Sequence, residues 1–177
     1  MKPEETSLAA TLSENKSALI TRWLEQTLQT YPDPSVKFFS HPQDPFRNPV
    51  GYTLKEGLSV LYDGLVQSSS ASAMQAPLES IIRIRAVQDI SASRAVAFIF
   101  QLKRIVRTEL PGDCIRFPDE LAALEVRIDE LTLLAFDLFM KCREQIFEIK
   151  ANESMRMAFL GEKIRLKGKA NPVNDTR

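Results

Sequence analysis

The chain has 177 residues, which is enough for one domain that buries a sizeable core without disulfides or a metal ion. Lysine and arginine number 23, as do aspartate and glutamate, so no overall positive field favours binding to nucleic acid. The N-terminal segment MKPEETSLAATLSENK is polar, and no window approaches the roughly 20 apolar residues of a membrane span. We therefore expect a cytoplasmic protein that binds no nucleic acid.

Histidine is almost absent, which excludes several kinds of catalytic site. His41 is the only histidine and lies in the proline-rich stretch SHPQDPFRNP, so no multi-histidine metal site can form. A Ser-His or Cys-His nucleophile would depend on this one residue, and no matching signature surrounds it. The six glycines form no phosphate-binding loop. Cys114 and Cys142 lack zinc or CxxC spacing and are expected to be reduced. We expect a protein that is not an enzyme and holds no cofactor.

The first half of the chain predicts two helices separated by a proline-rich loop. Leucines recur every three or four positions over residues 6–31, with a possible break and new helix start at Ser13, and the prolines after Tyr31 end this helix. Residues 35–40 are expected to form one short turn, and 41–49 a loop. Asn48 and Pro49 then have the residue types of an N-cap and first helical position, which predicts a helix over 50–67.

A serine-rich loop at 68–72 precedes two helices that are joined by a very short corner. The first carries isoleucines at 81, 82 and 84 and ends near Asp89. The second begins after Ser91, whose hydroxyl can accept a hydrogen bond from the first helical turn. Its run AVAFIF at 95–100 is apolar on every side, so we expect it at the centre of the domain.

The last predicted helix begins near Pro118 and is unusually long. Its apolar residues keep a three-and-four spacing from Leu121 to Cys142, as bundle or coiled-coil packing requires. Between Leu131 and Met140 apolar residues occupy all sides, which predicts neighbours on more than one side. After Asn152 the chain becomes basic and mixed. We expect a globular domain over 1–155 and a flexible basic tail over 156–177, for which docking on an anionic membrane is the weaker alternative.

These elements predict an all-α bundle of about six helices. Four stretches also resemble a known family, namely KSALITRWLEQTL, NPVGYTL, IIRIRAVQDISASRAVAFIFQLKRIVR and LLAFDLFMKCREQIFEIKANE. Together they resemble the RsbRD N-terminal domain, the sensor-side domain of RsbT co-antagonist proteins in bacterial stressosome signalling, over roughly residues 8–155. The resemblance implies a globin-like fold without haem and a homodimer. It also implies a signalling or partner-docking role in stress or energy-metabolism regulation.

One departure from that family concerns the C-terminal STAS domain, which co-antagonists carry after this region. The sequence ends about where it would begin, so we expect an isolated input module whose antagonist activity is in doubt. The absence of haem that the resemblance implies agrees with the position of His41 in a loop, because a globin holds its haem with a histidine on a helix. We expect Cys142 to be a core residue rather than an iron ligand. The alternative function is binding of a small apolar ligand, such as a fatty acid, in the vacated pocket.

Several residues are candidates for such a pocket, and each has a structural alternative. Asp137 lies in the apolar stretch LLAFDLFM and needs a cationic partner if it is buried. The candidate partners are Arg83, Arg85 and Lys103. We favour a helix–helix salt bridge or an exposed position for Asp137 over a role as the polar anchor of a ligand pocket. Arg83 and Arg85 could bind a partner protein or an anion, although Arg85 is also four residues from Asp89 and could pair with it. The aromatic candidates are Phe98, Phe100 and Phe136, which either line a cavity or fill the core.

The dimer-interface candidates lie on the last helix. Leu124, Ile128 and Leu131 belong to its regular apolar stripe, and the apolar surface of this helix exceeds what one core needs. We expect a homodimer through this stripe, and a regulatory protein as a further partner.

Overall fold

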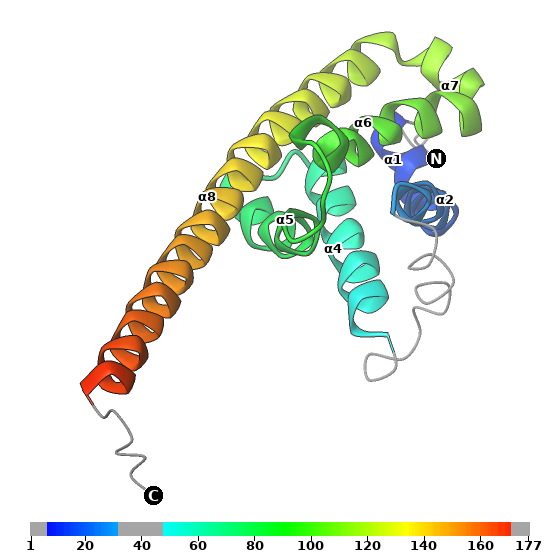
Figure 1. Cartoon of the computed structure of the whole chain (residues 1–177). Helices are drawn as coiled ribbons and strands as arrows, with labels where there is room; N and C mark the ends of the chain where they lie inside the picture. Colours follow the sequence, from blue (N-terminus) through cyan, green and yellow to red (C-terminus); the bar gives the residue numbers. More distant parts are fainter. Residues whose placement is uncertain (1–6, 32–47, 171–177) are drawn as a thin grey trace, which may run out of the picture.

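The computed structural model describes residues 7–31 and 48–170, and within these ranges the regular secondary structure is entirely helical (Figure 1). The predicted all-α fold class is therefore confirmed. The helices are α1 (Leu8–Glu14), α2 (Lys16–Gln29), α4 (Pro49–Val66), α5 (Ala71–Ala86), α6 (Ala92–Glu109), α7 (Pro111–Arg116) and α8 (Pro118–Ala170). The turn expected at 35–40 and His41 lie outside the described residues.

Two helix starts predicted from capping residues are confirmed. The Asn48 side-chain oxygen accepts a hydrogen bond from the Gly51 N–H at 2.8 Å, and Pro49 follows as the first residue of α4. The Ser91 hydroxyl accepts one from the Arg94 N–H at 3.4 Å at the start of α6. Each cap satisfies a backbone donor that the first helical turn leaves without a partner.

The first predicted helix is divided into α1 and α2, but the division falls at Asn15 rather than at Ser13. The Ser13 hydroxyl donates to the Ala9 carbonyl at 2.8 Å and so stays inside α1. The Asn15 amide donates to the Thr11 carbonyl at 2.9 Å, and its backbone leaves helical geometry, with φ −93° and ψ 7°. A short polar side chain that bonds the preceding turn in this way offers the backbone an alternative to a continuous helix.

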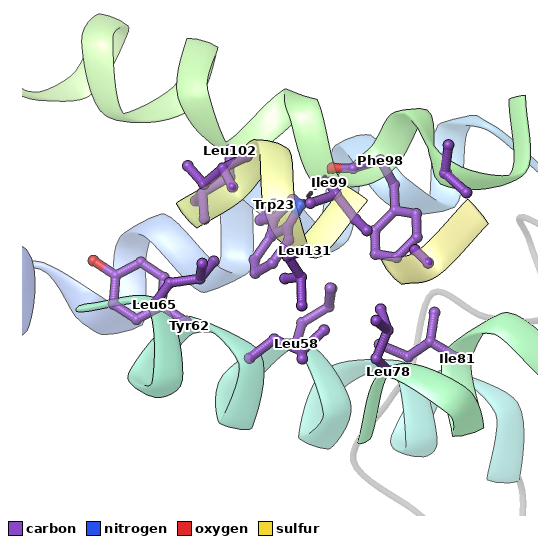
Figure 2. Close-up of a cluster of buried hydrophobic side chains, with 14 of the residues drawn as sticks. Trp23, Leu58, Tyr62, Leu65, Leu78, Ile81, Phe98, Ile99, Leu102 and Leu131 are labelled. Atoms are coloured by element: carbon purple, nitrogen blue, oxygen red, sulfur yellow. Dashed lines mark hydrogen bonds between the residues drawn. The ribbon is translucent and has the colours of Figure 1, made fainter. Parts of the chain in front are cut away.

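The core lies where α2, α4, α5, α6 and the first half of α8 meet (Figure 2). Trp23 of α2 is fully buried, and its indole N–H donates to the Phe98 carbonyl of α6 at 2.7 Å. Tyr62 of α4 is also buried, and its hydroxyl donates to the Leu12 carbonyl of α1 at 2.9 Å. Trp23 and Tyr62 are thus buried with the polar atom of each side chain hydrogen-bonded, which avoids the cost of burying an unpaired donor.

The second half of α8 projects beyond the other helices (Figure 1). Ile146 is partly buried, and each side chain from Phe147 to Leu166 is exposed. We call residues 147–170 the arm. The arm is helical to Ala170, and residues 171–177 of the tail predicted over 156–177 lie outside the described residues. No proline lies between Pro118 and Ala170, and each of the two glycines in this range, Gly161 and Gly168, costs only about 1 kcal/mol of helix propensity.

Because the side chains of residues 147–166 are exposed, removal of the arm should leave the stability of the body unchanged. We expect a chain that ends at Asn152 to unfold in urea with a free energy within about 0.5 kcal/mol of the full chain. The helical signal in circular dichroism gives the urea unfolding curves of both chains. A clearly less stable shortened chain would mean that the arm folds back onto the body.

Candidate functional site

Arg85 was a pocket candidate, but it lies in the core. Its Nε donates to the Ala95 carbonyl at 2.7 Å, and Nη2 donates to the Thr30 hydroxyl at 2.9 Å and the Arg94 carbonyl at 3.0 Å. The side chain is fully buried, with its guanidinium carbon 4.9 Å from the centre of the Tyr31 ring. Burial lowers the pKa of Arg85 and raises that of Tyr31, while their mutual interaction opposes both shifts. Arg85 therefore joins α5 to α2 and α6 instead of pairing with Asp89.

Arg83 and Asp137 lie on the surface. Arg83 is bound to Glu79 one turn earlier in α5, with Nη2 2.6 Å from Oε1. Lys103, another expected partner of Asp137, pairs instead with Asp129 at 2.6 Å. Asp137 is exposed, which agrees with the favoured interpretation that it does not anchor a ligand. Asp137 therefore lies within an apolar stretch of sequence without being a buried charge.

The three phenylalanine candidates do not line one cavity. Phe98 is fully buried beside Trp23, with their ring centres 6.3 Å apart. Phe100 and Phe136 are 46% and 42% exposed, so they face outward. The polar candidates are likewise divided between core and surface. These positions give no support to a ligand pocket between the central helices and α8.

The residues predicted to form the dimer interface are covered within one chain. Leu124, Ile128 and Leu131 are at most 2% exposed and belong to the core. Helices α5 and α6 pack against this face of α8. The regular three-and-four stripe is therefore an intramolecular contact, and it is not available to a second copy.

A different apolar face of α8 is exposed, contrary to the prediction that its middle part is covered on more than one side. Leu133 is 68% exposed and Met140 49%, and they flank the half-exposed Phe136. Val126 and Phe147 extend this row at intervals of seven residues and are also exposed. Seven-residue spacing keeps side chains on nearly the same side of a helix.

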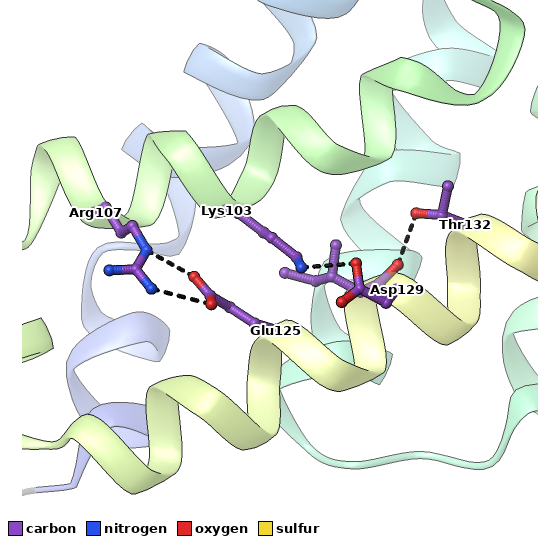
Figure 3. A network of polar contacts seen from close by, with 6 residues as sticks. Lys103, Arg107, Glu125, Asp129 and Thr132 are labelled. Atoms are coloured by element: carbon purple, nitrogen blue, oxygen red, sulfur yellow. Dashed lines mark hydrogen bonds and ion pairs between the residues drawn. The ribbon is translucent and has the colours of Figure 1, made fainter. Parts of the chain in front are cut away.

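Helix α6 contributes Phe100 to the same face. Two ion pairs fix the antiparallel register of α6 and α8, namely Arg107 with Glu125 at 2.7 Å and Lys103 with Asp129 at 2.6 Å (Figure 3). One further turn along this register brings Phe100 level with the turn of α8 that carries Leu133. We call Phe100, Leu133, Phe136 and Met140 the outer face.

Charged groups of opposite sign border the outer face. Glu130, Asp137 and Glu144 are exposed and follow one edge at seven-residue intervals. Near the opposite edge, Arg143 donates from Nη1 to the Ala86 carbonyl at 3.2 Å, and its guanidinium lies over Phe147. An apolar centre with a charged rim is the usual anatomy of a protein–protein contact.

Comparison with known families identifies the domain. Residues 17–154 match the model of the RsbT co-antagonist protein rsbRD N-terminal domain. The chain belongs to this family. The resemblance expected from the sequence is thus confirmed, and it assigns the chain to a stressosome-type signalling input domain. Searches of curated proteins and of solved structures gave no match. Among the described residues, no helix is both long and apolar enough to cross a membrane.

Proposed function

We propose that this chain is a non-enzymatic signalling module that acts in the cytoplasm by binding other proteins through the outer face. Membership of the RsbRD N-terminal family supports a signalling role. The observation that carries the binding role is the cluster of four large apolar side chains, each 42% to 68% exposed, on two adjoining helices. Contiguous exposed apolar surface of this kind is typical of interaction sites.

We further propose that a second copy of the chain is one partner, in a parallel arrangement. In a parallel pair related by a two-fold axis, the acidic edge of one outer face meets the opposite edge of the other. Glu130, Asp137 and Glu144 of each copy would then approach the side that carries Arg143. An antiparallel pair would instead place the two acidic edges together, which is unfavourable because like charges repel. The globin-like fold and a role in stress or energy-metabolism regulation are parts of the same proposal.

Substitution on the outer face tests this function. Leu133→Glu places a charge at the centre of the face, and the exposed position tolerates it without unfolding. We expect sedimentation equilibrium to give a dimer for the wild-type chain and a monomer for Leu133→Glu, with unchanged helical circular dichroism. Ile115→Glu is the matched control, because Ile115 is 82% exposed on α7 and should leave the dimer intact.

Two results would contradict self-association through this face. One is a wild-type chain that remains monomeric at the highest soluble concentration. The other is a Leu133→Glu variant that keeps the dimer mass.

A further inference from the structure

A small cleft lies where α1, the end of α4 and the start of α8 meet, away from the outer face. Its volume is about 170 Å³. Leu8, Leu12 and Leu124 line it, and these side chains are almost fully buried, so its floor is apolar and well packed. Val66 and Ser68 line the side formed by the end of α4, and Ser68 has a left-handed backbone with φ 55°. This turn directs the chain away from the cleft toward α5.

Arg127 supplies a positive charge to the wall of the cleft. Its Nε donates to the Leu65 carbonyl at 2.9 Å, which fixes the side chain against the last turn of α4. Within the described residues this is the only hydrogen bond of the guanidinium, so both terminal nitrogens keep their donors. The residue is partly buried, which strengthens its attraction for an anion relative to a fully solvated arginine.

Glu120 stands two turns earlier on α8 and does not neutralise Arg127 by a direct ion pair. One of its carboxylate oxygens accepts the Leu8 N–H of α1 at 2.9 Å. Seven residues of helix separate the two charges by about 10 Å along the axis. The cleft therefore has a cationic end at Arg127 and an acidic end that already serves as a backbone acceptor, with apolar surface between them.

We propose that this cleft binds a short-chain monocarboxylate, with the carboxylate on Arg127 and the alkyl chain on the leucine floor. Guanidinium groups bind carboxylates by two parallel charge-assisted hydrogen bonds, and Arg127 has the donors for them. The volume corresponds to about six water molecules at ~30 Å³ each, the size of an acid with about six non-hydrogen atoms such as butyrate. The cleft is smaller than pockets for drug-sized ligands, which begin at about 300 Å³, so a short acid fits it best. This proposal does not depend on the dimer.

Titration with butyrate, followed by amide chemical shifts in heteronuclear NMR, tests the site. We expect saturable shifts at Val66, Ser68 and Ala123, and no saturable shifts with butyramide, which has the same shape without the charge. Arg127→Gln should weaken butyrate binding about tenfold or more, because a charge-assisted hydrogen bond is lost. Since this variant also loses the contact with Leu65, a second variant is needed.

Ala123→Leu fills the cleft from an exposed position on α8, and Ala122→Leu is its matched control, because Ala122 does not line the cleft. We expect Ala123→Leu to abolish butyrate binding and Ala122→Leu to retain it. The proposal is overturned if butyrate gives no saturable shift, if butyramide binds equally well, or if Ala123→Leu binds like the wild type. Loss of the dimer in Leu133→Glu should leave butyrate binding unchanged. The dimer and the carboxylate site can therefore be refuted independently of one another.

Discussion

Replacement of Phe98 by alanine is expected to lower the free energy of unfolding by about 3–5 kcal/mol, the largest effect among the substitutions considered. The ring is fully buried and packs beside Trp23 and under the Arg85 guanidinium, 5.2 Å from its carbon. Its loss removes apolar contacts and leaves a cavity that three helices border. Urea unfolding followed by circular dichroism measures the change.

Phe100→Ala is the matched control for Phe98→Ala, since it removes the same ring two residues along α6. Phe100 is 46% exposed, so we expect a loss below about 1 kcal/mol. Phe100→Ala should instead weaken the dimer. Equal losses of stability in the two variants would contradict the assignment of Phe98 to the core and Phe100 to the outer face.

Replacement of Arg85 by alanine is expected to cost about 2–4 kcal/mol of unfolding free energy. The variant loses hydrogen bonds to Ala95, Arg94 and Thr30, which join three helices, and leaves an unfilled volume. Removal of a buried cation recovers part of this cost, because its desolvation penalty disappears. Arg85→Met, which keeps most of the volume, should therefore be clearly more stable than Arg85→Ala.

Arg83→Ala is the matched control for Arg85. Arg83 is exposed and pairs with Glu79 on the surface of α5, so its removal should change the unfolding free energy by less than about 0.5 kcal/mol. Urea midpoints for the three variants give the comparison. A loss in Arg85→Ala no greater than that in Arg83→Ala would show that the buried contacts of Arg85 do not stabilise the bundle.

The sequence was sufficient to predict features that depend on neighbouring residues. Asn48 with Pro49, and Ser91, mark helix starts through local capping chemistry, and the structure confirms both. The apolar run 95–100 predicted a central helix, and Ala95, Val96, Phe98 and Ile99 are buried, although Phe100 at its end is exposed. The all-α class follows from the same local periodicities.

Features that depend on distant residues could not be predicted in this way. Periodicity showed that Leu124 and Leu131 share a stripe, but not whether α5 and α6 or a second copy would cover it. The seven-residue row through Leu133 and Met140 was present in the sequence, yet its exposure depends on which side of α8 the helices α5 and α6 cover. Likewise, the buried Arg85 is held by carbonyls nine and ten residues away, whereas sequence spacing suggested an ion pair with Asp89.

Methionine oxidation tests most directly whether the outer face is the surface that binds protein. Met140 lies on the outer face and is 49% exposed, Met157 lies on the arm and is 71% exposed, and Met74 is buried. In dilute hydrogen peroxide, mass spectrometry of the wild-type chain should show Met140 protected and Met157 oxidised at concentrations where the dimer forms. In Leu133→Glu both should be oxidised, with Met74 protected throughout. Oxidation of Met140 at the same rate in wild type and Leu133→Glu would contradict a protein contact at this face.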